Sequence, residues 1–154
     1  MKSIETWLAE YGESHQNPLN KTIHWICVPL ISFSIVGFFY SVELPLKITE
    51  GFNLNLAVIM LVLVTMYYFT LSKSLSVGML LYSILCVAGC YGIQQTGLPV
   101  WAVCAGIFVL AWIFQFYGHE VEGKKPSFLK DLQYLMIGPA WLMSFVYKKL
   151  GLNL

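Results

Sequence analysis

The chain of 154 residues contains no arginine, and only 11% of its residues are charged. A soluble domain usually carries about 25% charged residues, so this chain has too few to cover a surface exposed to water. Its nine basic residues are all lysines, which is too few for a surface that follows nucleic-acid phosphates. Hydrophobic residues make up 58% of the chain, which excludes disorder. The composition therefore indicates an integral membrane protein that embeds in lipid and binds no nucleic acid.

Long stretches without a formal charge predict where the chain crosses the membrane, because a spanning helix needs about 20 apolar residues. Two such stretches have 21 and 22 residues, and a third has 46 residues, from 74 to 119. The third is about twice a span, and turn-forming residues at 94–99 divide it into a helical hairpin. We therefore predict one all-α, multi-pass membrane domain over residues 1–154, a helical bundle with spans at about 23–41, 54–71, 75–93 and 100–117.

A fifth apolar segment, residues 132–147, has 16 residues. At 1.5 Å per residue it would be about 24 Å long, which is short for a crossing. Gly138-Pro139 also interrupts its middle. We therefore expect a re-entrant or interfacial segment in preference to a fifth span.

The positions of the lysines predict the orientation. With four spans and a re-entrant fifth segment, eight of the nine lysines lie on the side of the N-terminus and only Lys47 lies on the other. Cytoplasmic loops carry the excess of lysine, so we place the N-terminus in the cytoplasm. The first 21 residues are polar, so no signal peptide is expected.

Within this polar N-terminal segment, four apolar residues follow helical spacing. Ile4, Trp7, Leu8 and Tyr11 stand at i, i+3, i+4 and i+7, which predicts a short amphipathic helix. Such a helix either lies on the membrane surface or packs on the loops of the bundle, and the spacing is compatible with both.

Three histidines carry the candidate chemistry. His15 and His24 flank the start of the first predicted span and His119 ends the fourth, so all three lie at the cytoplasmic end. Imidazole is the commonest metal ligand, and Glu122 stands three residues after His119 on the same helix face. Three histidines with a carboxylate and no thiolate suit Fe(II), Zn(II) or Mn(II). A single interfacial histidine more often makes a local hydrogen bond, so both a metal site and local hydrogen bonds stay open at this point.

Polar neighbours of the histidines predict supporting contacts. Asn17 with Pro18 predicts the start of a helix that carries Asn20 and His24 at i and i+4. Because both nitrogens of a ligating imidazole need partners, we expect Asn17, Asn20 and Gln115 to support the ligands.

Two blocks of the sequence resemble the signature of the Mpo1-like family, once described as a domain of unknown function. The first block runs Tyr11-x3-His15-x-Asn17-x2-Asn20-x3-His24-x4-Pro29. The second runs Gln115-Phe116-Tyr117-Gly118-His119, through Glu122-Gly123-Lys124-Lys125-Pro126, to Gly138-Pro139. The apolar middle of the chain is similar to the family in length and span pattern.

The resemblance implies an Fe(II)-dependent dioxygenase of lipid α-oxidation, which uses O2 to shorten a 2-hydroxy fatty acid by one carbon. It implies that His15, His24 and His119 hold the iron, with Glu122 near the acidic position of the second motif. We expect the substrate hydroxyl and carboxylate to chelate the metal while the tail lies between the spans. The other expected site residues are Tyr11, Asn17, Asn20, Gln115 and Lys124 in catalysis, and Lys21, Trp25 and Lys125 in substrate binding.

Two other functions remain compatible with the residues. One is a zinc-dependent membrane lipid hydrolase, and the other is a non-enzymatic membrane protein that binds lipid headgroups or a partner. Lys124 and Lys125, for example, would meet anionic headgroups as readily as the acidic end of a substrate. The short chain is more similar to bacterial relatives, so we expect the bacterial inner membrane, or the endoplasmic reticulum in a eukaryote.

Overall fold

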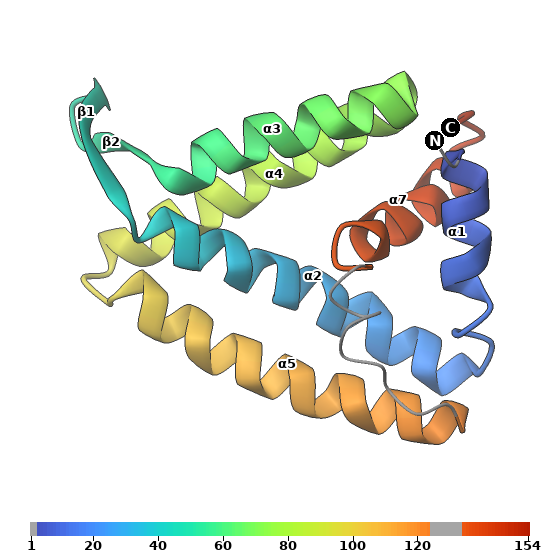
Figure 1. Ribbon diagram of the computed structural model, residues 1–154. Helices are drawn as coiled ribbons and strands as arrows, with labels where there is room; N and C mark the ends of the chain where they lie inside the picture. Colours follow the sequence, from blue (N-terminus) through green and yellow to red (C-terminus); the bar gives the residue numbers. More distant parts are fainter. Residues whose placement is uncertain (1–2, 124–133) are drawn as a thin grey trace.

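The computed structural model describes residues 3–123 and 134–154, and Figure 1 shows their arrangement. These residues form six helices and one β-hairpin. In chain order the elements are α1 (Ile4–Gly12), α2 (Pro18–Tyr40), β1 (Glu43–Thr49), β2 (Phe52–Asn55), α3 (Leu56–Leu71), α4 (Lys73–Gln95), α5 (Val100–Glu122) and α7 (Ile137–Lys149). The predicted all-α class is confirmed, with the hairpin as an addition.

Two pairs of long helices make up the body of the molecule. α2 packs along α5, and α3 packs along α4 (Figure 1). α2 also contacts α3 and α4, so it is the central helix. Gly37 of α2 lies against Cys104 of α5, where the added Cβ of any other residue would collide with the Cys104 sulfur. Small residues at such contacts are typical of helix packing in membranes, because lipid supplies no hydrophobic force between helices.

Among the described residues, three helices are long and apolar enough to cross a membrane: α2, α4 and α5, each of 23 residues. They overlap the predicted spans 23–41, 75–93 and 100–117 and extend beyond them. α3, which occupies the predicted span 54–71, has 16 residues, about 24 Å at 1.5 Å per residue. Helix length therefore supports three of the four predicted spans.

Side-chain caps set helix boundaries that charge-free stretches alone do not locate. The Asn17 side chain accepts a hydrogen bond from the N–H of Leu19 at 2.9 Å, and Pro18 opens α2, which confirms the predicted N-cap. Ser72 alone separates α3 from α4, and its hydroxyl accepts a hydrogen bond from the N–H of Leu75 at 3.1 Å. This short connection makes α3 and α4 an antiparallel pair.

The β-hairpin between α2 and α3 is missing from the sequence-based prediction. β1 and β2 pair antiparallel, with Lys47 opposite Asn53. Gly51 forms the turn with a φ of 83°, which favours glycine. Glu50-Gly51 is typical of a turn between two strands. Because this segment is charged, it was predicted only as a loop between two spans. The hairpin lies at the end of the bundle opposite α1 (Figure 1).

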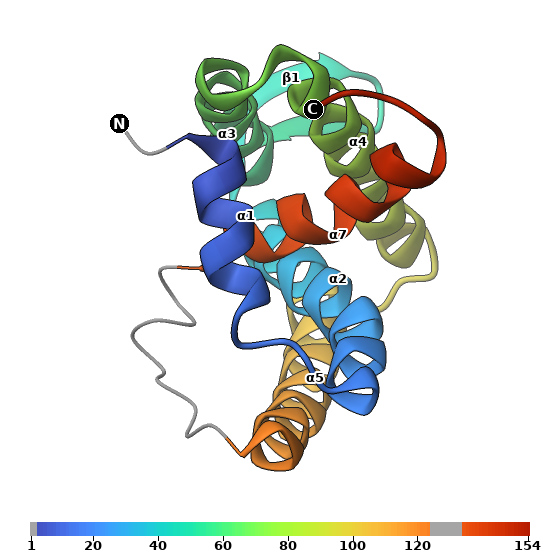
Figure 2. The same cartoon turned by 90° about the vertical axis from the view of Figure 1, so that its right-hand side faces the viewer.

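The apolar stripe of α1 packs against α7. Ile4, Leu8 and Tyr11 are buried in one cluster with residues of α7 that include Ile137 and Trp141. Figure 2 shows α1 and α7 at the end of the bundle that faces the viewer. The predicted helix is therefore confirmed, and its apolar face is buried by protein rather than by the membrane surface.

α7 begins where the sequence suggests an interruption. Gly138 and Pro139 lie in the first turn of α7, where a proline has no intrahelical hydrogen bond to lose. The break predicted at Gly138-Pro139 therefore lies slightly earlier, in a turn at residues 134–136 just before α7, and residues 132 and 133 lie outside the described part of the chain. α7 has 13 residues, about 20 Å, which is too short for a fifth span.

The described lysines divide between the two ends of the bundle as predicted. Lys21 lies in the first turn of α2, Lys73 begins α4, and Lys148 and Lys149 end α7. These helix ends lie at the end of the bundle that holds α1 (Figure 1). Lys47 lies in the hairpin. We call these two regions the α1 end and the hairpin end.

Candidate metal centre

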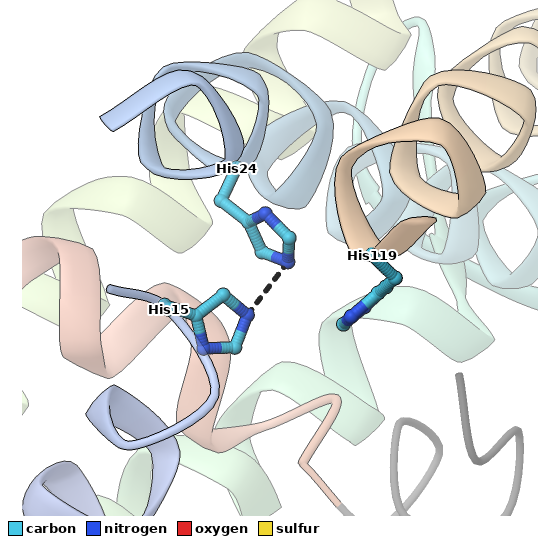
Figure 3. Close-up of side chains that lie close together, drawn as sticks. All are labelled: His15, His24 and His119. Atoms are coloured by element: carbon cyan, nitrogen blue, oxygen red, sulfur yellow. Dashed lines mark hydrogen bonds between the residues drawn. The ribbon is translucent and has the colours of Figure 1, made fainter. Parts of the chain in front are cut away.

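Three histidine side chains meet at the α1 end (Figure 3). His15 lies in the connection between α1 and α2, His24 in the second turn of α2, and His119 in the last turn of α5. Each side chain is at most 5% exposed. One ring nitrogen of each histidine lies within 4.8 Å of the corresponding atoms of the other two. This arrangement places three potential ligands around one small volume.

Hydrogen bonds determine which nitrogen of the His15 and His24 rings carries the proton. Nδ1 of His15 donates to the Tyr11 carbonyl at 2.6 Å, and Nδ1 of His24 donates to the Asn20 carbonyl at 2.9 Å. The Nε2 atoms of the two neutral rings are therefore unprotonated. These Nε2 atoms lie 2.7 Å apart, so two lone pairs face each other. This contact is repulsive unless a cation, either a metal ion or a proton, lies between the nitrogens.

His119 joins this pair because α5 packs closely on α2. Its ring centroid lies 5.2 Å from that of His24 and 5.8 Å from that of His15. Gly118 allows this approach, since a Cβ at that position would lie 2.6 Å from Oδ1 of Asn20. The glycine therefore determines how near the His119 ring can come to α2.

Aromatic rings enclose His15. The Tyr11 ring stacks on it with a centroid distance of 4.3 Å and an interplanar angle of 15°. The Trp141 ring of α7 lies 5.3 Å from it, and Tyr134 packs edge-on against Tyr11. These contacts hold the orientation of the imidazole and shield it from water.

Glu122 connects the end of α5 to the start of α2. One carboxylate oxygen accepts from the N–H of Gln16 at 2.8 Å, and the other accepts from the N–H of Asn17 at 2.9 Å and from Nδ2 of Asn20 at 3.0 Å. Glu122 lies past the apolar part of α5; burial alone would raise its pKa, but these hydrogen bonds outweigh burial and hold the pKa below its usual value. The ionised side chain thus holds the connection that carries His15, and its predicted role as a metal ligand stays a prediction.

The other predicted polar residues divide into two groups. Tyr11, Asn20 and Gln115 each contact an imidazole, the first two through backbone carbonyls and the third through its amide. Asn17 instead caps α2 and reaches the site only through Glu122.

The residues predicted to bind substrate lie around the site rather than in it. Lys21 is partly buried in the first turn of α2. Trp25 is 44% exposed on α2, and its ring lies 6.0 Å from that of Phe145 of α7. Lys124 and Lys125 lie outside the described residues.

Comparison with known proteins supports the resemblance carried by the two histidine motifs. The family model described as "2-hydroxy-palmitic acid dioxygenase Mpo1-like" matches residues 1–150. The chain belongs to the Mpo1-like family. It is also 31% identical over 150 residues to the protein of Saccharomyces cerevisiae named 2-hydroxy-palmitic acid dioxygenase MPO1, across 96% of this chain and 82% of the yeast protein. No solved structure matches it.

The donors in this Mpo1-like chain fit a divalent transition metal. Imidazole nitrogens bind such ions at about 2.0–2.1 Å, so two ligands at a right angle about one ion lie about 3 Å apart. The Nε2 atoms of His15 and His24, at 2.7 Å, need to separate by only a few tenths of an ångström to accept one. Three buried imidazoles suit both Fe(II) and Zn(II).

Three residues shape this Mpo1-like site but were not predicted from the sequence as site residues: Gly118, Gly138 and Trp141. A Cβ at Gly138 would lie 3.1 Å from the Tyr11 hydroxyl and 3.1 Å from Val28, so α7 approaches α1 and α2 closely there. Both glycines belong to the second motif, and this position in the sequence could have identified them as residues of the site. Trp141 had no such signal, because an aromatic residue in an apolar helix is ordinary.

Proposed function

We propose that this protein is a membrane-embedded, Fe(II)-dependent dioxygenase that cleaves the C1–C2 bond of 2-hydroxy fatty acids. The observation that carries the proposal is the meeting of three buried imidazoles, two of which direct Nε2 lone pairs at each other across 2.7 Å. The name of the yeast relative supports the substrate class. The long apolar helices around the site support a lipid substrate.

The proposed reaction balances with one molecule of O2. The C1–C2 bond breaks, C1 leaves as CO2, and C2 becomes the carboxyl carbon of a fatty acid one carbon shorter. Four electrons pass to O2, and one molecule of water forms. Fe(II), held by His15, His24 and His119, would supply the one-electron chemistry that lets O2 react with a closed-shell substrate.

The chain's own residues orient the ligands and exclude water. The carbonyls of Tyr11 and Asn20 hold the rings of His15 and His24 with Nε2 directed inward. The rings of Tyr11 and Trp141 cover His15. A buried centre of this kind protects reactive oxygen chemistry from side reactions with water.

The location of the site suits an amphipathic substrate. The substrate head would lie at the α1 end, beside the buried polar groups, and the tail would follow the apolar faces of α2 and α5 toward the hairpin end. A cavity of about 30 Å³ is lined by Tyr11 and Gln115, which contact the rings of His15 and His24. It has room for a group the size of a water molecule or of O2.

The proposed orientation follows the lysines. α2, α4 and α5 cross the membrane with the α1 end in the cytoplasm. α3, with 16 residues, forms a fourth span where the bilayer thins locally. The site then lies on the cytoplasmic face of a bacterial inner membrane, or of the endoplasmic reticulum in a eukaryote.

Anaerobic reconstitution tests the proposal. The full chain in lipid nanodiscs receives Fe(II), then O2 and a 2-hydroxy fatty acid labelled with ¹³C at C1. Mass spectrometry is expected to find the acid one carbon shorter, together with labelled CO2. The same acid without the 2-hydroxyl group is the matched control and is expected to remain unchanged. If no shortened acid forms from any chain length while iron is bound, the proposed reaction is wrong.

Three imidazoles also fit a zinc hydrolase, in which a zinc-bound water attacks an ester or amide. The metal content of anaerobically purified protein and the dependence of turnover on O2 separate the two functions. Zinc with O2-independent release of a fatty acid would replace the dioxygenase proposal. Unchanged metal content in His15→Ala, His24→Ala and His119→Ala would instead support a protein without a catalytic metal.

A further inference from the structure

Gln115 lies closer to the imidazole pair than a supporting role requires. It stands on α5 one turn before His119, and it is 6% exposed. Its Nε2 lies 2.7 Å from Nε2 of His24, the same nitrogen that Nε2 of His15 contacts at 2.7 Å. The Gln115 amide and the two imidazoles therefore meet at one point.

The hydrogen bond of Gln115 uses the lone pair that a metal needs. Because Nδ1 of His24 donates to the Asn20 carbonyl, Nε2 of His24 accepts the N–H of Gln115. A metal ion bound to this Nε2 would occupy the same lone pair and would face the N–H group. A cation repels an N–H group, so the amide must turn when His24 binds a metal.

The oxygen of the same amide is available to replace the nitrogen. Oε1 of Gln115 is buried, and no hydrogen-bond donor to it is found in the described ranges 3–123 and 134–154. Buried acceptors nearly always have a partner, so an acceptor without one calls for an explanation. Rotation of the amide by 180° exchanges the oxygen and the nitrogen, which are similar in size, and moves no backbone atom.

We propose that Gln115 is a ligand of the metal centre through Oε1, together with His15, His24 and His119. This inference rests on the metal site of the proposed function but is independent of the reaction. A carboxamide oxygen is neutral, so a dication held by three imidazoles and Gln115 keeps its full charge. That charge attracts the carboxylate of a fatty acid in a chain that has no arginine to do so.

A Co(II) titration of the full chain in detergent micelles tests the assignment. The visible spectrum of Co(II) reports the number and type of its ligands. Gln115→Ala and Gln115→Leu remove the oxygen, so they are expected to weaken Co(II) binding about 10-fold or more and to change the spectrum. Gln115→Glu keeps an oxygen at the same place and adds a charge, so it is expected to bind Co(II) at least as tightly as the wild type. Gln95→Ala, exposed at the end of α4, is the matched control and is expected to change neither property.

The carboxylate variant separates a ligand from a hydrogen-bond donor. If Gln115 acts only as a donor, Gln115→Glu will bind Co(II) as weakly as Gln115→Ala, because a carboxylate has no N–H. That result overturns the assignment, and so does an unchanged Co(II) spectrum in Gln115→Ala. Circular dichroism of the metal-free proteins checks that each variant folds, and Gln115→Leu, which keeps most of the volume, replaces Gln115→Ala if alanine prevents folding.

The Co(II) titration measures metal binding alone and does not depend on turnover. If the Co(II) results hold but no shortened fatty acid forms, the proposed reaction is wrong and the assignment of Gln115 stands. If the wild-type chain binds no Co(II), the assignment of Gln115 is overturned together with the metal site.

Discussion

The α1 end and the hairpin end differ in what their cavities contain. At the hairpin end, α3, α4 and β1 line a cavity of about 740 Å³ with walls that are mostly apolar, including Leu61, Val62 and Ile84. The cavity at the α1 end measures only about 30 Å³, yet one of the residues that line it, Gln115, contacts a cluster of three buried imidazoles. In this chain, the meeting of buried polar groups marks the candidate site, and cavity size does not.

The contrast has a physical cause. A buried polar group must find a partner, so the polar side chains of the α1 end restrict one another's positions. The apolar side chains of the hairpin end have no directional partners, and in a bilayer lipid tails can fill the space between them. Substitutions at the α1 end should therefore change metal binding far more than substitutions at the hairpin end.

Removal of an imidazole should have the largest effect. His24 is fully buried and contacts both His15 and Gln115, so His24→Ala is expected to weaken Co(II) or Fe(II) binding by more than about 100-fold. Anaerobic titration and metal analysis measure this loss. If His24→Ala binds metal as tightly as the control Gln95→Ala, the α1 end is not the metal-binding end and the predicted difference between the two ends is wrong.

A methyl group at Gly118 should have the next largest effect. Its Cβ would lie 2.6 Å from Oδ1 of Asn20, so α5 must move away from α2. Overpacking of this kind costs about 1–3 kcal/mol, and we expect metal affinity to fall at least about 10-fold as His119 moves away. Gly106→Ala on the same helix is the matched control, because a Cβ there meets no atom within 4 Å among the described residues. Thermal unfolding and Co(II) titration of the two variants should differ clearly, and equal behaviour would argue against the close contact of α5 with α2.

Loss of the Glu122 charge should have a smaller effect. Glu122→Gln keeps the shape but weakens charge-assisted hydrogen bonds to Gln16, Asn17 and Asn20, so we expect a loss of about 1 kcal/mol in the free energy of unfolding. Metal affinity should fall several-fold, because the connection that carries His15 is less well held. Glu120→Gln, at an exposed position on α5, is the control. A Glu122 variant that lost all metal binding would instead support its predicted role as a ligand.

Filling the large cavity should have the smallest effect. Ala88 lines it at an exposed position of α4, and Ala88→Leu should narrow it without reaching the imidazoles. We expect Co(II) affinity to stay within about 2-fold of the wild type, since distant sites usually behave independently. The chain-length preference of turnover is the second measurement. A shift toward shorter substrates would show that the tail occupies the hairpin end and that the two ends act together.

Much of the architecture was accessible from the sequence because it depends on local patterns. The apolar helices follow from stretches without charge, and the start of α2 follows from Asn17 and Pro18. The hairpin was missed because its signal is a short turn at Gly51 within a polar segment. The break in the last apolar segment was placed at Gly138-Pro139 instead of at residues 134–136, because proline is compatible with the first turn of a helix as well as with an interruption.

The candidate site shows the same division between local and tertiary information. Composition and charge order were sufficient to place three histidines at one end of the helical bundle. They could not show whether Gln115 or Glu122 meets the imidazoles, because both stand on α5 within one turn of His119. The choice depends on the rotation of α5 about its own axis against α2, and the close contact of Gly118 with Asn20 sets that rotation. Such a contact joins residues about a hundred positions apart, so it was established by packing and not by any local pattern.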